Sequence, residues 1–208
     1  MIYRALIPVK TLSQAKSRLA DHLTHEQRAS LVLDMLHHVI STLKTSNLLE
    51  SVTVVSPDLR VLEKAELWGA RARVEEESGH NPALHAAAQR ELAEGATALL
   101  TISADLPLLG VHDIEGMFAQ SQEYPVVLAP SWDGTGTNAL LTRPPLALPY
   151  VFGPGSLQHF LAEAREWQLG NVLYNNRGIA LDIDTIDDLD LFHCYETEGK
   201  AMYASCYV

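Results

Sequence analysis

The stretch Leu-Leu-Thr-Ile-Ser-Ala-Asp-Leu-Pro-Leu-Leu, residues 99–109, constrains the fold of this chain more than any other. An apolar run bounded by turn signals is typical of a central parallel strand, which is buried on both faces. Asp105 stands at the carboxyl end of this predicted strand, and Pro107 ends it. Because ligands of open α/β sheets bind beyond the carboxyl ends of the strands, Asp105 lies where a ligand would arrive.

Asp105 has two interpretations at this point. An aspartate inside an apolar strand and turn is costly to bury alone, which favours a metal ion or a network of hydrogen-bond donors as its partner. It could equally be a turn residue or the cap of the helix that follows. The local sequence leaves both open.

Other segments surround this strand at a regular spacing. Further strands are expected at residues 3–9, 51–56, 70–74, 125–130, 139–141, 171–174 and 178–181. Helices are expected after the capping box Thr24–Gln27, at residues 58–68, 81–93, 111–120 and 156–167, and after Thr185. This alternation predicts an α/β fold of three layers with a mainly parallel sheet, in one domain spanning residues 1–208. The tail, residues 193–208, is expected to be loose or to pack at a subunit contact.

Composition narrows the class of partner. A net charge of −11 argues against nucleic acid, because affinity for nucleic acid comes from clustered Lys and Arg. No apolar run approaches membrane-spanning length, and the first residues lack a basic region followed by an apolar core, so we expect a cytoplasmic protein without a membrane partner. Cys194 and Cys206 show neither a metal-binding nor a disulfide pattern, which suits a reducing compartment.

Positive charge gathers near the N-terminus, where Arg4, Lys10, Lys16 and Arg18 precede the first acid, Asp21. The loop after the first strand, residues 9–19, has the position of a nucleotide-binding loop but lacks the Walker A pattern. We call it the basic loop. We expect its lysines and arginine to supply charges for a triphosphate, while loop amides hold the phosphate oxygens. The alternative is a solvated basic face.

Two glycine-rich turns follow the predicted central strand. Gly134 and Gly136 match the dinucleotide pattern only weakly, because they precede a strand, and we expect a tight turn close to a ligand or a plain hairpin. The segment Phe-Gly-Pro-Gly-Ser, residues 152–156, opens a helix with free amides and a hydroxyl, which suits a phosphate or carboxylate. Ser156 could instead be an ordinary helix cap.

Asp182 and Asp184 place two carboxylates two residues apart, on one face of an extended segment. Such a pair repels itself unless a cation lies between the two groups. Together with Asp105 they therefore suggest a magnesium site. Asp187 and Asp188 more simply complement the dipole of the last helix.

Four segments then agree with one known family, in order and over nearly the whole chain: residues 7–19, residues 103–108, residues 134–138 with 152–156, and residues 181–185. Together they resemble the CofC/FbiD family of guanylyltransferases, which act in the biosynthesis of the deazaflavin coenzyme F-420. The resemblance implies the nucleotidyltransferase version of the GT-A fold. It also implies transfer of GMP from GTP to 2-phospho-L-lactate or phosphoenolpyruvate, with release of diphosphate.

The resemblance further implies a role for particular residues. Mg²⁺ would be held by Asp105, Asp182 and Asp184; the nucleotide by Pro8, Val9, Lys10, Lys16, Arg18 and Asn81, the last near the base; and the phosphorylated acid by Thr137, Asn138, Gly153, Gly155 and Ser156. Lys16 and Asp105 are the expected catalytic residues. Some relatives have Thr where this chain has Asn138, which leaves the choice of acid open.

The expected chemistry needs no general base, because the attacking phosphate oxygen is already anionic. It needs charge neutralisation and in-line placement of two anions, which a metal ion and the basic loop would provide. The alternatives are another nucleotidyl- or sugar transferase of the same fold, and a nucleotide-binding protein without catalysis. The sequence also allows a homodimer.

Overall fold

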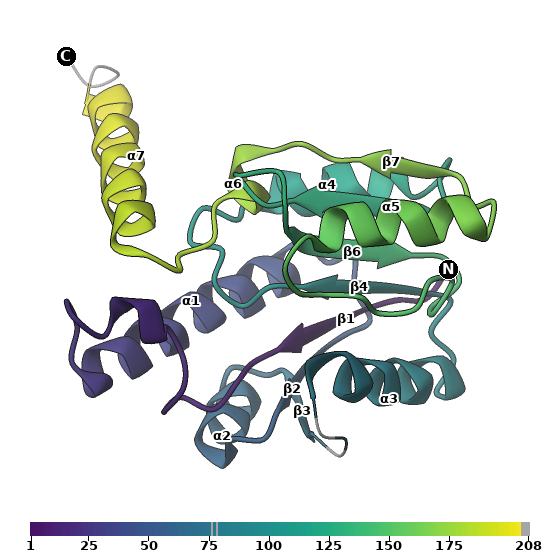
Figure 1. The fold of residues 1–208 in the computed structure, drawn as a ribbon, viewed down its shortest axis with the longest axis horizontal. Helices are drawn as coiled ribbons and strands as arrows, with labels where there is room; N and C mark the ends of the chain where they lie inside the picture. Colours follow the sequence, from purple (N-terminus) through teal and green to yellow (C-terminus); the bar gives the residue numbers. More distant parts are fainter. Residues whose placement is uncertain (76, 78, 205–208) are drawn as a thin grey trace.

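The structure of the protein is a computed structural model that describes residues 1–75, 77 and 79–204, and only the backbone of residues 196–204. Seven strands form one sheet in the order β3-β2-β1-β4-β6-β5-β7 (Figure 1). The strands are β1 Tyr3–Pro8, β2 Ser51–Ser56, β3 Arg71–Val74, β4 Ala98–Ile102, β5 Val126–Pro130, β6 Thr137–Thr142 and β7 Asn171–Leu173. The helices are α1 His25–Thr45, α2 Leu59–Leu67, α3 His80–Ala93, α4 Val111–Gln120, α5 Ser156–Glu166, α6 Arg177–Ala180 and α7 Ile186–Ala204, with a short 3₁₀ helix, η1, at Ser17–Leu19.

The sheet is mainly parallel, as predicted. β1 pairs in parallel with β2 and β4, β2 with β3, and β5 with β7, whereas β6 runs antiparallel to both of its neighbours. The carboxyl ends of β1, β2 and β4 therefore meet at one edge of the sheet. The loops that follow these strands share that edge, where ligands of such sheets bind.

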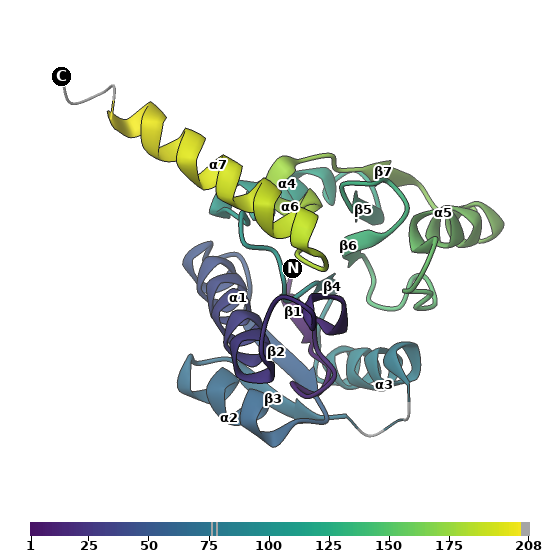
Figure 2. The same ribbon diagram turned by 60° about the vertical axis from the view of Figure 1, so that its left-hand side comes forward.

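Helices cover both faces of the sheet, which makes three layers (Figure 2). One core packs the sheet against α1, α2 and α4 and includes Leu36, Val61 and Met117. On the other face, Leu84 of α3 and Phe160 of α5 lie in two smaller cores against the sheet. The apolar faces of the predicted helices thus account for the layered arrangement.

The predicted central strand is shorter in the structure. β4 is buried along its whole length and ends at Ile102, not at the turn containing Pro107. The backbone amide of Ser103 still donates to the Asn138 carbonyl at 2.8 Å, and the chain then leaves the sheet. Asp105 consequently lies in the loop beyond β4, at the edge where the site is expected.

Residues 178–181 were predicted as a strand, and this was wrong, because residues 177–180 form the single helical turn α6. The Asn176 side chain caps the turn by accepting from the Gly178 amide at 2.9 Å. Ile179 and Leu181 are buried, which explains the apolar pattern. The periodicity of a short apolar run does not distinguish a strand from a buried turn. Here the cap at Asn176 starts a helical turn.

Three predicted helix starts are confirmed. Thr24 and Gln27 form the expected capping box of α1, and Thr185 accepts a hydrogen bond from the Asp188 amide at 3.4 Å at the start of α7. Asp58 caps α2 by accepting from the Arg60 amide. Figures 1 and 2 show α7 leaving the body of the molecule. Cys206 and the last residues of the predicted tail lie outside the described residues.

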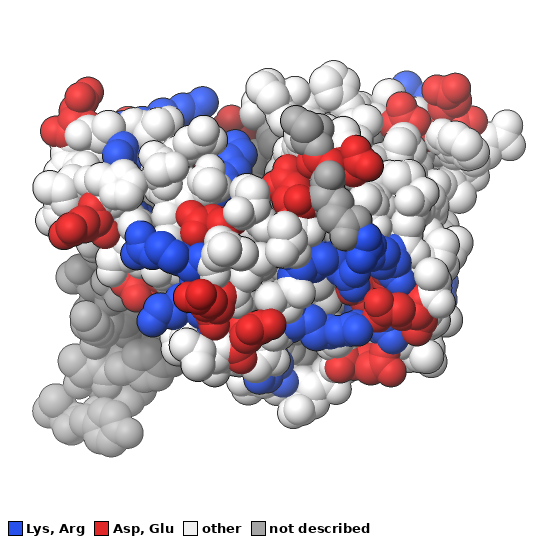
Figure 3. Space-filling model, turned by 90° about the horizontal axis from the view of Figure 1, so that it is seen from below, with Lys and Arg blue, Asp and Glu red and all other residues white. Residues whose placement is uncertain are grey.

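Buried charges fix α3 against the strands. Glu91 of α3 is fully buried; its Oε2 accepts from the Arg4 guanidinium at 3.0 Å, and its Oε1 accepts from the Thr53 hydroxyl at 2.8 Å. Arg71 donates to Glu94 at 2.7 Å nearby. Figure 3 views the molecule from the side of α2 and α3 and shows acidic and basic side chains intermixed. Within the described residues, no helix is long and apolar enough to cross a membrane.

Candidate active site

A cleft of ≈ 880 Å³ opens beyond the carboxyl ends of β1 and β4. Of the predicted site residues, it is lined by Pro8, Val9, Lys10, Lys16, Arg18, Asp105, Thr137, Asn138, Gly153, Ser156, Asp182 and Asp184. Gly155 belongs to the turn between two of these residues, whereas Asn81 lines a neighbouring groove. The fold therefore brings residues from both halves of the chain into one cavity.

Three carboxylates meet in this cleft. Asp105 comes from the loop after β4, and Asp182 and Asp184 come from the extended segment between α6 and α7. One carboxylate oxygen of each lies within 4.8 Å of the others. Clustered carboxylate oxygens are the ligands that Mg²⁺ and Ca²⁺ prefer in proteins, so this donor set fits a divalent cation.

The ammonium of Lys16 lies against two of these carboxylates. It contacts Asp105 and lies 2.9 Å from Asp184 Oδ1, and the Lys16 side chain is only 7% exposed. Burial alone would lower the pKa of Lys16, but the charges of Asp105 and Asp184 raise it above its ordinary value. The backbone of Lys16 has φ 52°, a left-handed conformation that is uncommon outside glycine. The site thus already binds one positive charge.

Among the described side chains, none that is cationic lies within hydrogen-bonding distance of Asp182. Burial, reinforced by the negative charge of Asp105, raises the pKa of Asp182 to about 6. The charge of Lys16 and the hydrogen bond from Asn138 act in the opposite direction but do not offset this rise. This second observation also favours a cation bound between Asp182 and the other two acids.

Asn138 holds Asp182 in place. Its side-chain Nδ2 lies 3.1 Å from Asp182 Oδ1 and 2.9 Å from each of the carbonyl oxygens of Ile179 and Ala180, to which it donates. The amide group of Asn138 is therefore engaged with the chain. The neighbouring hydroxyl of Thr137 is buried and has no hydrogen-bond partner among the described residues. Buried polar groups in proteins are generally hydrogen-bonded, and a ligand in the cleft could supply the missing partner of this hydroxyl.

The first glycine-rich turn is held by an aspartate that the sequence patterns did not single out. Asp133 accepts hydrogen bonds from the Ser131 hydroxyl at 2.6 Å and from the Thr135 amide and hydroxyl at 2.9 and 2.7 Å. These bonds lower the pKa of Asp133 to about 2. Gly134 takes φ 70° at the tip. A Ser-x-Asp-x-Thr pattern around a glycine is the signal that could have predicted this turn.

The second glycine-rich turn begins α5. The residue at the N-cap is Gly155, with φ 69°, and Ser156 is the first residue of the helix. The alternative in which Ser156 caps the helix is therefore wrong. The expectation of free amides at this helix start is also wrong, because the Ser156 amide donates to the Gly153 carbonyl at 3.0 Å and the Leu157 amide to the Thr135 carbonyl at 3.2 Å. These bonds close the turn at the edge of the cleft.

The segment that carries Asp184 is anchored by the start of α7. Asp188 Oδ2 accepts from the backbone amides of Asp184 and Thr185, at 2.9 and 2.7 Å. Asp188 was expected only to complement the dipole of this helix. The structure shows that it also fixes the backbone beside Asp184, and that it lines the cleft itself.

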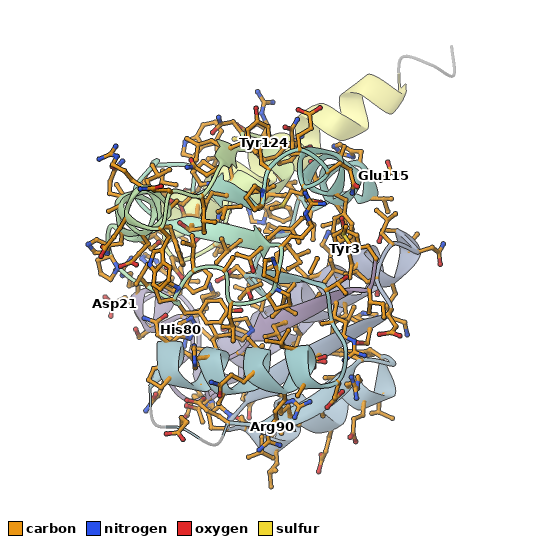
Figure 4. The ribbon with its side chains drawn as sticks, turned by 90° about the vertical axis from the view of Figure 1, so that its right-hand side faces the viewer. Tyr3, Asp21, His80, Arg90, Glu115 and Tyr124 are labelled. Carbon is orange, nitrogen blue, oxygen red and sulfur yellow. The ribbon has the colours of Figure 1, made fainter. Side chains whose placement is uncertain are left out.

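Two further residues border the cleft although no role is predicted for either of them from the sequence. The Ser103 hydroxyl donates to Asp105 Oδ1 at 2.5 Å, which orients that carboxylate. His80 lies at the start of α3 (Figure 4). Burial, together with the charge of Lys10, lowers the pKa of His80. Its ring meets Phe152 edge-on, with 6.0 Å between ring centroids.

Comparison with known sequences identifies a family over almost the whole chain. The family described as "Guanylyl transferase CofC like" matches residues 3–205. A phosphoenolpyruvate guanylyltransferase of Rubrobacter xylanophilus is 43% identical over 186 residues, and one of Sphaerobacter thermophilus is 40% identical over 186 residues. Each alignment covers 89% of this chain and 90% of the relative. A 2-phospho-L-lactate guanylyltransferase of Methanobrevibacter ruminantium is 29% identical, over 94% of this chain and 88% of the relative.

Comparison with solved structures identifies the fold. A structure described as a nucleotide-diphospho-sugar transferase of Desulfovibrio desulfuricans G20 matches with a TM-score of 0.77 at 18% identity, covering 92% of this chain and 87% of that chain. A Methanothermobacter nucleotidyl transferase matches with a TM-score of 0.68 at 14% identity, covering 95% and 99%. The predicted nucleotidyltransferase type of fold is thereby confirmed.

Proposed function

The chain belongs to the family of CofC-like guanylyl transferases, and on that premise we propose that it transfers GMP from GTP to a phosphorylated three-carbon acid in coenzyme F-420 biosynthesis. The acid would be phosphoenolpyruvate or 2-phospho-L-lactate, the two acceptors that occur in the names of its relatives. Phosphoenolpyruvate is favoured, because the relatives that are 43% and 40% identical carry that name.

One observation carries the proposal: Asp105 and the pair Asp182 and Asp184 meet in the same cleft as the basic loop. Two anionic substrates repel each other, and the reaction needs them in contact. A cavity that combines three carboxylates with lysine and arginine side chains can bind a metal ion and a triphosphate side by side. This is the arrangement that phosphoryl-group chemistry requires.

The nucleotide would lie along the basic loop. Lys10, Lys16 and Arg18 line the cleft and would neutralise the phosphate oxygens, while the backbone of Pro8 and Val9 borders the same wall. A Mg²⁺ ion held by the three aspartates would add positive charge at the α-phosphate and at the leaving diphosphate. Lys16 is the residue best placed to touch both the acids and the triphosphate, since it already contacts Asp105 and Asp184.

The acid would lie on the opposite side of the carboxylates, at the two glycine-rich turns. The Thr137 hydroxyl is buried there without a partner among the described residues. Ser156, the first residue of α5, lines the cleft, and its hydroxyl would donate to the phosphate or carboxylate of the acid. Gly153 and Gly155 allow the turn to approach a ligand closely.

The reaction balances without a proton transfer. An anionic phosphate oxygen of the acid attacks the α-phosphorus of GTP and forms a new P–O bond. The bond from the α-phosphorus to the bridging oxygen breaks, and diphosphate leaves with that oxygen. The residues of this chain therefore need to position and neutralise charge, and no side chain has to act as a general base.

The proposal is tested by incubating the purified protein with Mg²⁺, each of the four common nucleoside triphosphates and each candidate acid. We expect GTP to give a product whose mass is that of the acid plus one guanylyl group, together with one diphosphate per product. In a parallel incubation with nucleotide sugars, transfer of the sugar without diphosphate release would identify a sugar transferase. Nucleotide binding without any product would identify a binding protein.

We further propose that the enzyme works in the cytoplasm, where GTP and phosphoenolpyruvate are formed, and that it is a homodimer. Support for the dimer comes from α7, whose outer part extends away from the body in both ribbon views (Figures 1 and 2). A helix that packs on little is marginally stable in water, because most helical stability comes from tertiary packing. A second copy of the chain could supply that packing.

A further inference from the structure

The connection between β6 and α5, residues 143–155, ends at the turn proposed to bind the acid and has no regular helix or strand. Its last part reaches the start of α3 on the same face of the sheet. Gly153 and Gly155 both have positive φ, 136° and 69°, so the turn has little intrinsic stiffness. Its position therefore depends on the residues that hold Phe152, directly before it.

Asn81 holds Phe152 through both ends of its side-chain amide. Asn81 Nδ2 donates to the Phe152 carbonyl at 3.0 Å, and the Phe152 amide donates to Asn81 Oδ1 at 3.0 Å. The side chain thus pairs with the backbone of Phe152 as a neighbouring strand would. We call these two hydrogen bonds the Asn81–Phe152 clasp.

The Phe152 side chain reinforces the clasp. Its ring meets Phe160 of α5 edge-on at 5.0 Å between centroids and stacks with Tyr150 at 5.7 Å. The Tyr150 hydroxyl is hydrogen-bonded to Thr101 of β4 at 2.7 Å. His80 meets the same Phe152 ring from the start of α3. The turn is therefore fixed between α3, α5 and β4.

The start of α3 also borders the nucleotide side of the cleft. His80 lines the cleft and lies close enough to Lys10 for that charge to lower its pKa. Asn81 does not line this cleft; it borders a separate groove of ≈ 380 Å³, together with His85 and Gln89. The Asn81 side chain is therefore not part of the wall of the cleft that holds the carboxylates.

We propose that Asn81 is a positioning residue for the acid-binding turn and does not read the nucleotide base. The clasp holds the turn, Gly153 to Ser156, against the start of α3, whose first residue, His80, lines the same cleft as the basic loop. This assignment rests on the proposed function for the identity of the two substrates, but the clasp itself can be measured without any substrate.

The test compares Asn81→Asp and Asn81→Ser with Gln89→Ala, a control that changes the same groove and leaves the clasp intact. Asn81→Asp keeps the acceptor for the Phe152 amide but sets a carboxylate oxygen against the Phe152 carbonyl, whereas Asn81→Ser removes both partners without adding charge. We expect amide hydrogen exchange in residues 150–157 to accelerate by about tenfold in both Asn81 variants, as the loss of a hydrogen bond predicts, and to stay unchanged in the control.

Kinetics and binding complete the test. We expect the KM for the acid to rise by about tenfold in the Asn81 variants, while calorimetry gives a Kd for a non-hydrolysable GTP analogue within about twofold of wild type. A tenfold weaker Kd for the analogue, or unchanged exchange in folded Asn81 variants, would overturn the proposal. If the wild-type protein accepts no acid, the proposed function fails, while the exchange and the analogue Kd still decide whether the clasp exists and whether Asn81 contacts the base.

Discussion

Lys16 shows how a single residue can compete with a ligand of its own site. Its ammonium contacts Asp105 and Asp184, two of the three carboxylates that fit a metal ion. The same residue belongs to the loop expected to bind the triphosphate. When a metal ion and a nucleotide enter the cleft together, the ammonium can exchange the carboxylates for phosphate oxygens.

The exchange predicts opposite effects of Lys16→Gln on two ligands. Mn²⁺, used in place of Mg²⁺, should bind the nucleotide-free variant about tenfold more tightly, because no ammonium competes for the carboxylates. A non-hydrolysable GTP analogue should bind about tenfold more weakly, because a phosphate contact is lost. Electron paramagnetic resonance of free Mn²⁺ and calorimetry measure the two affinities.

Lys10→Gln is the matched control, because Lys10 lines the same cleft but has no ion pair with the three carboxylates in the described structure. It should weaken the GTP analogue without tightening Mn²⁺. If Lys16→Gln binds Mn²⁺ no better than Lys10→Gln does, the competition does not exist.

The pKa of the single residue Asp133 gives a prediction about the dependence of stability on pH. Its hydrogen bonds to Ser131 and Thr135 lower its pKa to about 2, from an ordinary value near 3.9. A group whose pKa is lowered on folding stabilises the folded state above the unfolded pKa, and this contribution is lost as the pH falls toward 2. A titration of the Asp133 carboxyl carbon by nuclear magnetic resonance should have its midpoint near 2. A midpoint near 4 would mean that the turn is not held in solution as the structure shows.

Among the elements, β6 and the segment after α6 are joined by one side chain. Asn138 donates to the carbonyls of Ile179 and Ala180 and to Asp182, and is almost fully buried. Asn138→Ala leaves these acceptors unpaired, which should lower the free energy of unfolding by about 1–3 kcal/mol. It should also weaken Mn²⁺ binding about tenfold, because Asp182 loses its support.

Asn171→Ala is the control for this change, since the Asn171 side chain makes a single local bond to the Leu169 carbonyl. Chemical denaturation and calorimetry measure the two effects. A variant of Asn138 that loses stability but binds Mn²⁺ as the wild type does would show that Asn138 supports the fold and not the site.

The elements also show what the sequence alone can predict. The helix starts at Thr24 and Thr185 can be predicted from the sequence, because capping is a local interaction between residues three positions apart. The end of β4 and the turn α6 could not be predicted in the same way. Asn176 caps α6 locally, but Asn138 also contacts this turn by donating to the carbonyls of Ile179 and Ala180. The backbone carbonyl of Asn138 accepts from the Ser103 amide just beyond β4, and no local pattern predicts these long-range bonds.

The same distinction between local patterns and long-range contacts applies to the candidate site. Asp105 can be singled out because an acid beside an apolar run is costly to bury alone, and Asp182 and Asp184 because two acids two residues apart repel each other. The structure brings the three together. The contact of Lys16 with Asp105 and the clasp of Asn81 on Phe152 join residues that no pattern connects. Residue types and their spacing predict candidate groups for the chemistry, whereas the three-dimensional fold decides which group each one touches.

At the scale of the whole molecule, α7 bears on oligomeric state. Leu189 and Phe192, near its start, pack against the core formed by Leu19, Met35 and Ile183. The helix then continues to Ala204, away from the body (Figure 2). Analytical ultracentrifugation of the full chain should give twice the chain mass of 22.9 kDa. Removal of residues 196–208 should give the single chain mass, and a full chain that sediments as a monomer would contradict the dimer.

The central claim is that acids from two distant parts of the chain bind one divalent cation. A calorimetric titration of Mn²⁺ into the nucleotide-free protein at pH 7.5 tests it directly, because the pKa of Asp182, about 6, leaves the group ionised at that pH. We predict one site per chain, weakened by at least about tenfold in Asp105→Asn and equally in Asp182→Asn, with Asp187→Asn unchanged. Wild-type affinity in either Asp105→Asn or Asp182→Asn would contradict a shared cation.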